Sequence, residues 1–246
     1  MGFFSALSVF ALSLIVLSSL GKGEDYGSER ELRRDIFRGY DKLVRPVKKA
    51  STAVTVKISI SPLSLRSMSE KDQLMSLETW MTLKWTDEYL QWDPTEYDNI
   101  TELRISSSEI WKPDISLYTA SPITSLFPDV QVQAIVLNTG MIIWVPPFTI
   151  NNRCPIPYRN YVSVSRTFIE CNIKMGSWTF SGKTVDLQLD TDKVDLTNFQ
   201  DYNHEWKLVK VAANRESKLY PCCVDEYPSV NFNITLKKRN YYINDN

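Results

Sequence analysis

Short stretches of alternating apolar and polar residues dominate most of this chain. The alternation is clearest in 54–60, 185–189 and 230–236. Successive side chains of a strand point to opposite faces of a sheet, so each stretch predicts a strand with one buried face. In the third stretch, the pattern places Asn231 and Asn233 on the solvent face.

One segment near the N-terminus predicts a helix instead. Ser28 and Glu31 have capping-box spacing, and Pro46 closes the segment. Between them, apolar residues recur at helical spacing, at Leu32, Ile36, Phe37, Tyr40 and Leu43. Together the patterns predict an all-β fold: an immunoglobulin-like antiparallel β-sandwich of about ten strands with a short N-terminal helix. We expect one domain, spanning 24–246.

The alternation leaves one tryptophan on a polar face. Met81, Leu83 and Trp85 form the expected core face of their strand, so Trp80 shares the other face with Thr82. A tryptophan there is covered by a partner, lines a site, or is incidentally exposed.

Composition excludes several classes of function. The 246 residues are 43% hydrophobic with a formal net charge of -1, which suits a domain with a real core and gives no basic surface for nucleic acid. The one histidine, His204, lies in a polar stretch, and no nucleophile, phosphate-loop or metal-ligand motif is present. We therefore expect no enzyme, cofactor or metal site.

The N-terminus has the features of a secretory leader. The apolar stretch 3–20 is followed by small residues, which predicts a signal peptide over 1–23; a signal anchor is the alternative. No later stretch is long and apolar enough to span a membrane, so we expect a soluble, secreted, extracellular protein. Glycosylation sequons at Asn99 and Asn233 agree with export.

Two of the four cysteines, Cys222 and Cys223, are adjacent. Neighbouring Cα atoms lie about 3.8 Å apart, below the usual disulfide range, so a bond between them would give a rigid ring suited to stiffening a loop tip. The alternative is that each pairs elsewhere. Of the three possible pairings, spacing favours Cys222 with Cys223, and Cys154 with Cys171.

Several motifs in one order carry a family resemblance. They are WMTLKWTDEYLQWDP at 80–94, IWKPDISLY at 110–118, GSWT at 176–179, and the adjacent cysteines. Together they resemble the extracellular ligand-binding domain of nicotinic receptors, in the Cys-loop family. The polar tail 240–246 makes the chain most similar to the soluble acetylcholine-binding proteins of that family.

The resemblance implies a homopentameric ring that binds small cations, such as acetylcholine or nicotine, between subunits. The principal face would consist of Tyr118, Trp178, Tyr220, Cys222, Cys223 and Tyr227. The complementary face would consist of Trp80, Thr82, Ile143 and Val145. Asp114 and Lys174 would support the site without touching ligand. The remaining tryptophans are expected in the core, at Trp85, Trp92, Trp111, Trp144 and Trp206.

The chain also departs from the family pattern. Ser229 stands where receptors usually have the aspartate that pairs with the lysine at Lys174, and 119–122 differs from the usual loop. The Cys154–Cys171 loop encloses 16 residues and has a polar tip around 159–166, which suits a protein with no channel to contact. The alternatives are a pentameric scaffold, a binder of non-cholinergic amphiphiles, and a receptor ectodomain fragment.

Overall fold

A computed structural model describes residues 27–121, 124–125, 131–156 and 168–239. The predicted signal peptide, 1–23, and the polar tip around 159–166 lie outside the described residues.

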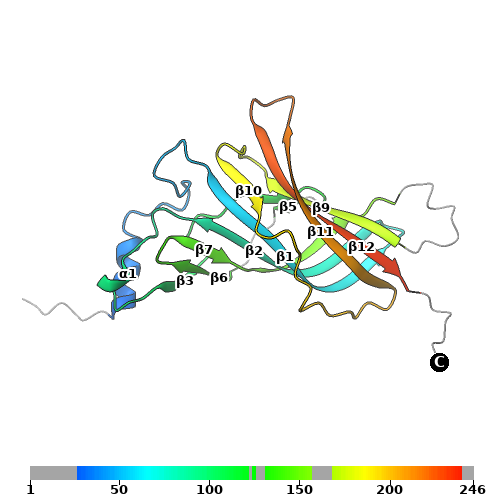
Figure 1. Cartoon of the computed structure of the whole chain (residues 1–246), viewed down its shortest axis with the longest axis horizontal. Coiled ribbons are helices and arrows are strands. Elements are labelled where there is room, and N and C mark those ends of the chain that lie inside the picture. The colour runs from blue at the N-terminus through cyan, green and yellow to red at the C-terminus, as the bar shows by residue number, and fades with distance from the viewer. Residues whose placement is uncertain (1–26, 122–123, 126–130, 157–167, 240–246) are drawn as a thin grey trace, which may run out of the picture.

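Two β-sheets form a sandwich, as the alternating patterns predict (Figure 1). The seven-stranded sheet contains β1 (Val54–Ser69), β2 (Leu74–Thr86), β3 (Glu102–Ser106), β6 (Gln133–Leu137), β7 (Met141–Trp144), β8 (Pro147–Arg153) and β10 (Val185–Leu189). The five-stranded sheet contains β4 (Ile115–Leu117), β5 (Thr124–Ser125), β9 (Phe168–Ser177), β11 (Trp206–Leu219) and β12 (Glu226–Lys238). The described residues thus contain twelve strands, against about ten expected.

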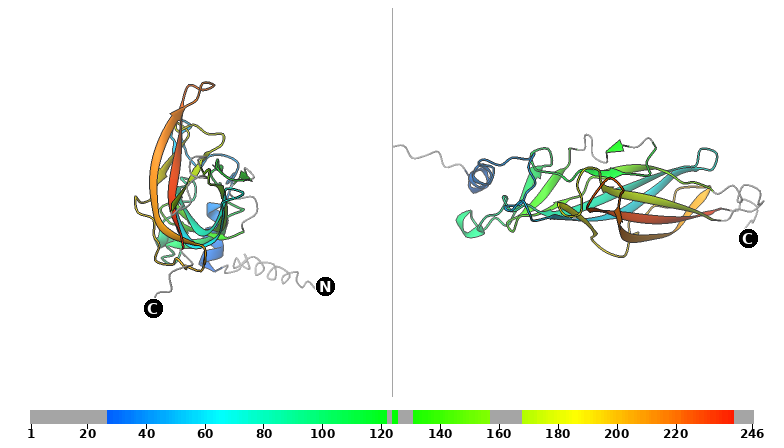
Figure 2. Two further views of the ribbon diagram at one scale, coloured as in Figure 1. Left: turned by 90° about the vertical axis from the view of Figure 1, so that its right-hand side faces the viewer. Right: turned by 90° about the horizontal axis from the view of Figure 1, so that it is seen from above.

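The order of strands in each sheet determines which segments can form a site. The five-stranded sheet has the order β11-β12-β9-β4-β5. In the other sheet the order is β10-β1-β2-β7-β6-β3, and β2 is long enough to pair with β7 along one part and with β8 along another. The end-on view in Figure 2 shows the two curved layers facing each other.

Side chains from both sheets fill the space between them. The predicted inward residues of β1 are buried, as are Phe232 and Ile234 of β12 and Met81 and Leu83 of β2. Four of the five tryptophans predicted for the core are buried, and Trp92 is partly buried against it. Cys154 and Cys171, both buried, form the predicted disulfide between the chain after β8 and strand β9.

The N-terminal helix is shorter than predicted and is capped differently. Helix α1 spans Ser28–Ile36, and its N-cap is Gly27, with no side-chain capping bond. The Ser28 hydroxyl instead donates to the Asp98 carboxylate, so the capping-box prediction was wrong. Ser28 is the first residue of the helix and not the residue before it, so its side chain is not in the capping position.

The helix ends before Tyr40: Gly39 adopts a left-handed φ of 77°, and Tyr40 turns to a partner distant in sequence. The Tyr40 hydroxyl donates to Asp87 Oδ2 at 2.6 Å and accepts the N–H of Trp111 at 3.0 Å. Asp87 is fully buried, so this bond satisfies a polar group that would be costly to leave unpaired. Leu43, predicted for the apolar helix face, is 85% exposed.

Two predictions about the strands also need correction. β1 and β10 pair in parallel, not antiparallel, because alternation gives the face of a residue and not the strand direction. Asn231 is buried although the alternation places it outward. It lies between Lys174 of β9 and Asn214 of β11, and its amide oxygen accepts from Asn172 Nδ2 at 3.3 Å.

Candidate ligand-binding site

A long hairpin, β11–β12, carries the adjacent cysteines at its tip, which projects from the body of the sandwich (top of Figure 1). The strands pair as far as Leu219 and Glu226. Cys222 and Cys223 form a disulfide with each other, which confirms the predicted pairing. The N–H of Cys223 donates to the carbonyl of Tyr220 at 3.0 Å, so the turn and the disulfide together close the tip.

The loop after β9 presents Trp178 to solvent. Asp114 holds this loop, because its carboxylate accepts from the N–H of Thr179 at 2.8 Å, from the Thr179 hydroxyl at 2.6 Å, and from the Ser177 hydroxyl. The N–H of Trp178 also donates to the Asp114 carbonyl, at 3.3 Å. The backbone is therefore fixed while the Trp178 residue remains 63% exposed.

Tyr118, directly after β4, packs under that loop. Its hydroxyl donates to the carbonyl of Ser177 at 2.6 Å, and its N–H donates to the carbonyl of Lys174 at 2.8 Å. A Cβ atom on Gly176 would lie 2.6 Å from the Tyr118 hydroxyl oxygen. Only glycine permits this close approach without a shift of the tyrosine ring.

Four of the predicted principal-face rings come together in the structure. The ring centroids of Tyr118 and Trp178 lie 6.1 Å apart, and those of Tyr220 and Tyr227 lie 5.8 Å apart, both edge-to-face. Burial raises the pKa of Tyr118 to about 12, and Tyr220, Asp114 and Tyr227 add to this electrostatically. Tyr118 therefore stays un-ionised at neutral pH and offers a neutral, electron-rich ring.

The four predicted complementary residues lie on the other sheet. Trp80 and Thr82 are in β2, Ile143 is in β7, and Val145 follows it. The register pairs Lys84 with Ile143, which puts Ile143 on the same face as Trp80 and Thr82. Trp80 is 41% exposed, and no hydrogen bond or ring contact among the described residues joins this set to the principal-face rings.

Lys174 has a charged partner in place of the missing aspartate. Its ammonium pairs with the carboxylate of Glu216 on β11, and the hydroxyl of Ser229 lies 3.4 Å from the same carboxylate oxygen. Glu216 and Ser229 are opposite each other across β11 and β12. The sequence analysis did not identify Glu216, since only the strand register shows that it faces Lys174.

Lys174 connects the hairpin to the segment that carries Tyr118. Its backbone bonds both residues of that segment. The Lys174 carbonyl accepts the N–H of Tyr118, and the Lys174 N–H donates to the Thr119 hydroxyl at 3.1 Å. Thr119 belongs to the segment that departs from the family pattern, and its hydroxyl bonds the buried Asn152 in turn. The altered residue is thus part of the framework of the site.

Replacing Glu216 with glutamine is expected to loosen the hairpin near the cysteine tip. A partly exposed ion pair contributes about 0.2–1 kcal/mol, so exchange of the amide hydrogens of Glu226 and Tyr227 should quicken about 1.4- to 5-fold. The bond from Lys174 lowers the pKa of Glu216 below its ordinary value. A lowered folded pKa gives stability that is present above the unfolded pKa, about 4.3, and is lost as pH falls through the folded value.

Exchange is compared with the intrinsic rate of each amide at the same pH. We expect the parent protein to lose protection below about pH 4, and the glutamine variant to lack this acid-dependent loss. Glu170→Gln is the matched control, because it removes an exposed carboxylate from β9, away from Glu216. It should change neither the exchange rate nor its dependence on pH. Equal exchange in Glu216→Gln and the parent would show that the ion pair does not restrain the tip.

Comparison with known proteins agrees with this architecture. Residues 29–240 match the model of the neurotransmitter-gated ion-channel ligand binding domain. The chain belongs to this family. Among curated proteins, this ligand-binding domain is 35% identical over 214 residues to the acetylcholine receptor subunit alpha-type acr-16 of Caenorhabditis elegans. It is 33% identical over 222 residues to the acetylcholine receptor subunit alpha-like 2 of Drosophila melanogaster and 32% identical over 216 residues to the human neuronal acetylcholine receptor subunit alpha-2.

The ligand-binding domain accounts for only part of each relative. The alignments cover 87%, 87% and 88% of this chain but 42%, 38% and 40% of the three relatives. Within the described residues, no helix has both the length and the apolarity needed to cross a membrane.

The other predicted positions of the ligand-binding domain lie at the surface. Asn99 and Asn233 are both exposed, and the side-chain amide of Asn233 donates to Asn214 Oδ1 at 3.0 Å. His204 is exposed as well. No group of three or more potential metal ligands occurs among the described residues.

Proposed function

We propose that this protein is a secreted binding protein that captures small organic cations of the acetylcholine and nicotine type. The supporting observation is the set of four rings in which the exposed indole of Trp178 packs edge-to-face on Tyr118, and Tyr220 packs edge-to-face on Tyr227, close enough for both tyrosines to act electrostatically on Tyr118. The curated relatives named above are acetylcholine receptor subunits, which supports the same ligand class.

Aromatic rings suit a quaternary ammonium better than a carboxylate does. A buried carboxylate would lose its hydration on pairing, whereas a ring face offers negative potential at a lower desolvation cost. Each desolvated cation–π contact contributes about 2 kcal/mol, and tryptophan is the best partner. Trp178 would make the main contact, and the disulfide of Cys222 and Cys223 would cover the ligand from the hairpin tip.

The site would be completed by a second copy of the chain. The principal and complementary sets lie on different sheets, and no hydrogen bond or ring contact joins them among the described residues. Trp80 and Val145 are 41% and 38% exposed, which leaves them available to a neighbouring subunit. A closed homopentameric ring would place one such site at each interface. Exposed sequons and two disulfides agree with secretion into an oxidising compartment.

Titration of the purified full-length protein with acetylcholine and with nicotine, followed by tryptophan fluorescence, tests the proposal. We expect saturable changes with both ligands, and a pentameric mass by sedimentation. A folded pentamer without a fluorescence or calorimetric response to either ligand would refute cholinergic binding and favour a scaffold or a binder of other amphiphiles.

A further inference from the structure

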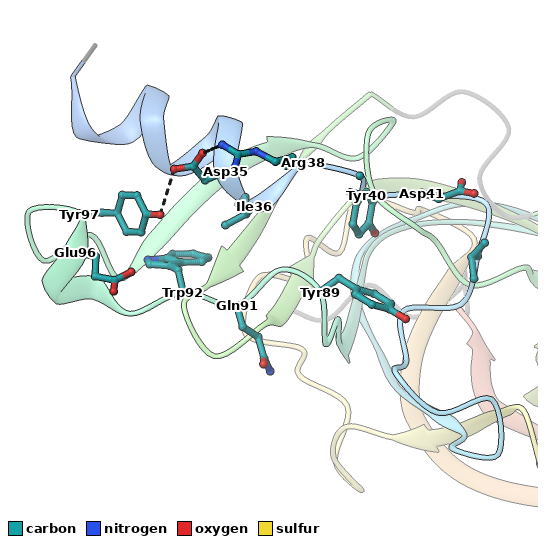
Figure 3. A pocket seen from close by; sticks show the side chains of 12 residues that line it. Asp35, Ile36, Arg38, Tyr40, Asp41, Tyr89, Gln91, Trp92, Glu96 and Tyr97 are labelled. Atoms are coloured by element: carbon teal, nitrogen blue, oxygen red, sulfur yellow. Dashed lines mark hydrogen bonds and ion pairs between the residues drawn. The ribbon is translucent and has the colours of Figure 1, made fainter. Parts of the chain in front are cut away.

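A separate hollow lies at the end of α1, on the part of the molecule away from the cysteine-tipped hairpin (Figures 1 and 3). Its volume is about 500 Å³, within the range of small-molecule sites. The residues around it come from the last turn of α1, the segment that follows, the chain after β2, and the 3-10 helix η1 (Pro94–Glu96). None of the proposed cation-cage residues lines it.

Four aromatic side chains line the hollow, and each has its polar end bonded to the protein. The Tyr40 hydroxyl bonds Asp87, and the Tyr89 hydroxyl donates to the carbonyl of Val47 at 3.1 Å. The Trp92 indole donates to the carbonyl of Ile100 at 2.7 Å. Tyr97, the fourth, donates to Asp35 at 3.4 Å. These bonds hold the four rings in place and occupy their polar groups. A ligand in the hollow would therefore contact the faces and edges of the rings.

Carboxylates outnumber cations around these rings. Three acidic side chains line the hollow, Asp35, Asp41 and Glu96, against one basic side chain, Arg38. Arg38 is already paired with Asp35 at 2.6 Å. The exposed carboxylates of Asp41 and Glu96 therefore give the rim a negative field, and Figure 3 shows Glu96 beside Trp92.

We propose that this hollow is a second binding site, for an amphiphilic organic cation with an aromatic or alkyl body and an ammonium group. The apolar body would pack on Trp92, Tyr97 and Ile36, and the ammonium would face the rim carboxylate of Glu96. The ring faces give cation–π attraction in addition to apolar contact. This inference does not depend on the proposed cholinergic site.

Fluorine NMR with 4-fluorophenethylamine tests it, using the full chain with the Trp178→Ala change, which is expected to weaken cation binding at the proposed cholinergic site. The neutral matched probe is 2-(4-fluorophenyl)ethanol. We expect saturable binding of the amine and about 1.4- to 5-fold weaker binding of the alcohol, since a partly exposed charge contact contributes about 0.2–1 kcal/mol. Glu96→Gln should reduce this preference, whereas Glu102→Gln, which removes an exposed carboxylate outside the hollow, should leave it unchanged.

A second pair of variants locates the site. Val44 lines the hollow and is 56% exposed, so Val44→Trp should fill the space from the rim and weaken amine binding at least about tenfold. The adjacent Leu43 does not line it, and Leu43→Trp should bind as the parent does. Absence of saturable binding, equal binding of amine and alcohol, or equal loss in both tryptophan variants would overturn the proposal. Loss of oligomerisation in Val44→Trp, without amine binding by the parent, would instead identify a contact between copies and would also overturn it.

Discussion

Replacing Trp178 with alanine is expected to weaken acetylcholine binding at least about 30-fold. The indole is the most exposed ring of the principal-face cluster, and its backbone is fixed by Asp114, so its loss removes a contact without disturbing the loop. A desolvated cation–π contact of about 2 kcal/mol corresponds to roughly this factor. Isothermal titration calorimetry measures the affinity of both proteins. It does not depend on tryptophan emission, which the substitution itself changes.

Trp178→Phe is the matched variant. It keeps a ring at the same place but offers a weaker negative face, so its affinity should fall between the parent and the alanine variant. Trp206→Phe, at a buried position on β11, controls for the loss of an indole anywhere in the fold and should leave affinity unchanged. If alanine at 178 binds acetylcholine as well as the parent does, Trp178 makes no contact with the cation.

Replacing Phe232 with alanine is expected to lower the free energy of unfolding by about 3–5 kcal/mol. Phe232 is 1% exposed, in the middle of β12, and lies opposite Ile173 of β9 and Ala213 of β11. Truncation leaves a cavity between rigid strands that cannot collapse around it. Urea denaturation at a fixed protein concentration gives the change, with an unaltered slope if the unfolded state is unaffected.

Phe168→Ala is the control, since it removes the same side chain from the same sheet. Phe168 is 54% exposed, and its ring contacts Lys237 at 5.9 Å, so its loss should cost less than about 1 kcal/mol. Similar costs for the two variants would mean that Phe232 is not part of a tightly packed core.

The local pattern was sufficient for the faces of most strand residues. The positions of Met81 and Leu83 inside the sandwich, and of Trp80 outside it, follow from a period of two that needs no knowledge of neighbours. The pairing of Cys222 with Cys223 was predictable for a similar reason, because the residues are joined by one peptide bond. The aromatic cluster followed from motifs spread along the chain and not from any local pattern.

Features that depend on contact between distant segments could not be predicted from the local sequence pattern. The helix was expected to continue to Leu43, but it ends at Ile36; Gly39 then adopts a left-handed φ, and Tyr40 bonds the buried Asp87. Asn231 was expected outside, but the side chains of neighbouring strands surround it. In both cases a tertiary contact outweighed a correct local preference.

The sequence by itself determined that this chain is a β-sandwich of the ligand-binding family, and it predicted which aromatic residues would form a site. Only the tertiary structure decided that Glu216 is the partner of Lys174, that β10 runs parallel to β1, and that the two halves of the predicted site lie on separate sheets. The physical reason is that alternation records only which side of a strand is buried. Strand order, direction and register arise from pairing between segments far apart in the chain, and they decide which charges and rings meet.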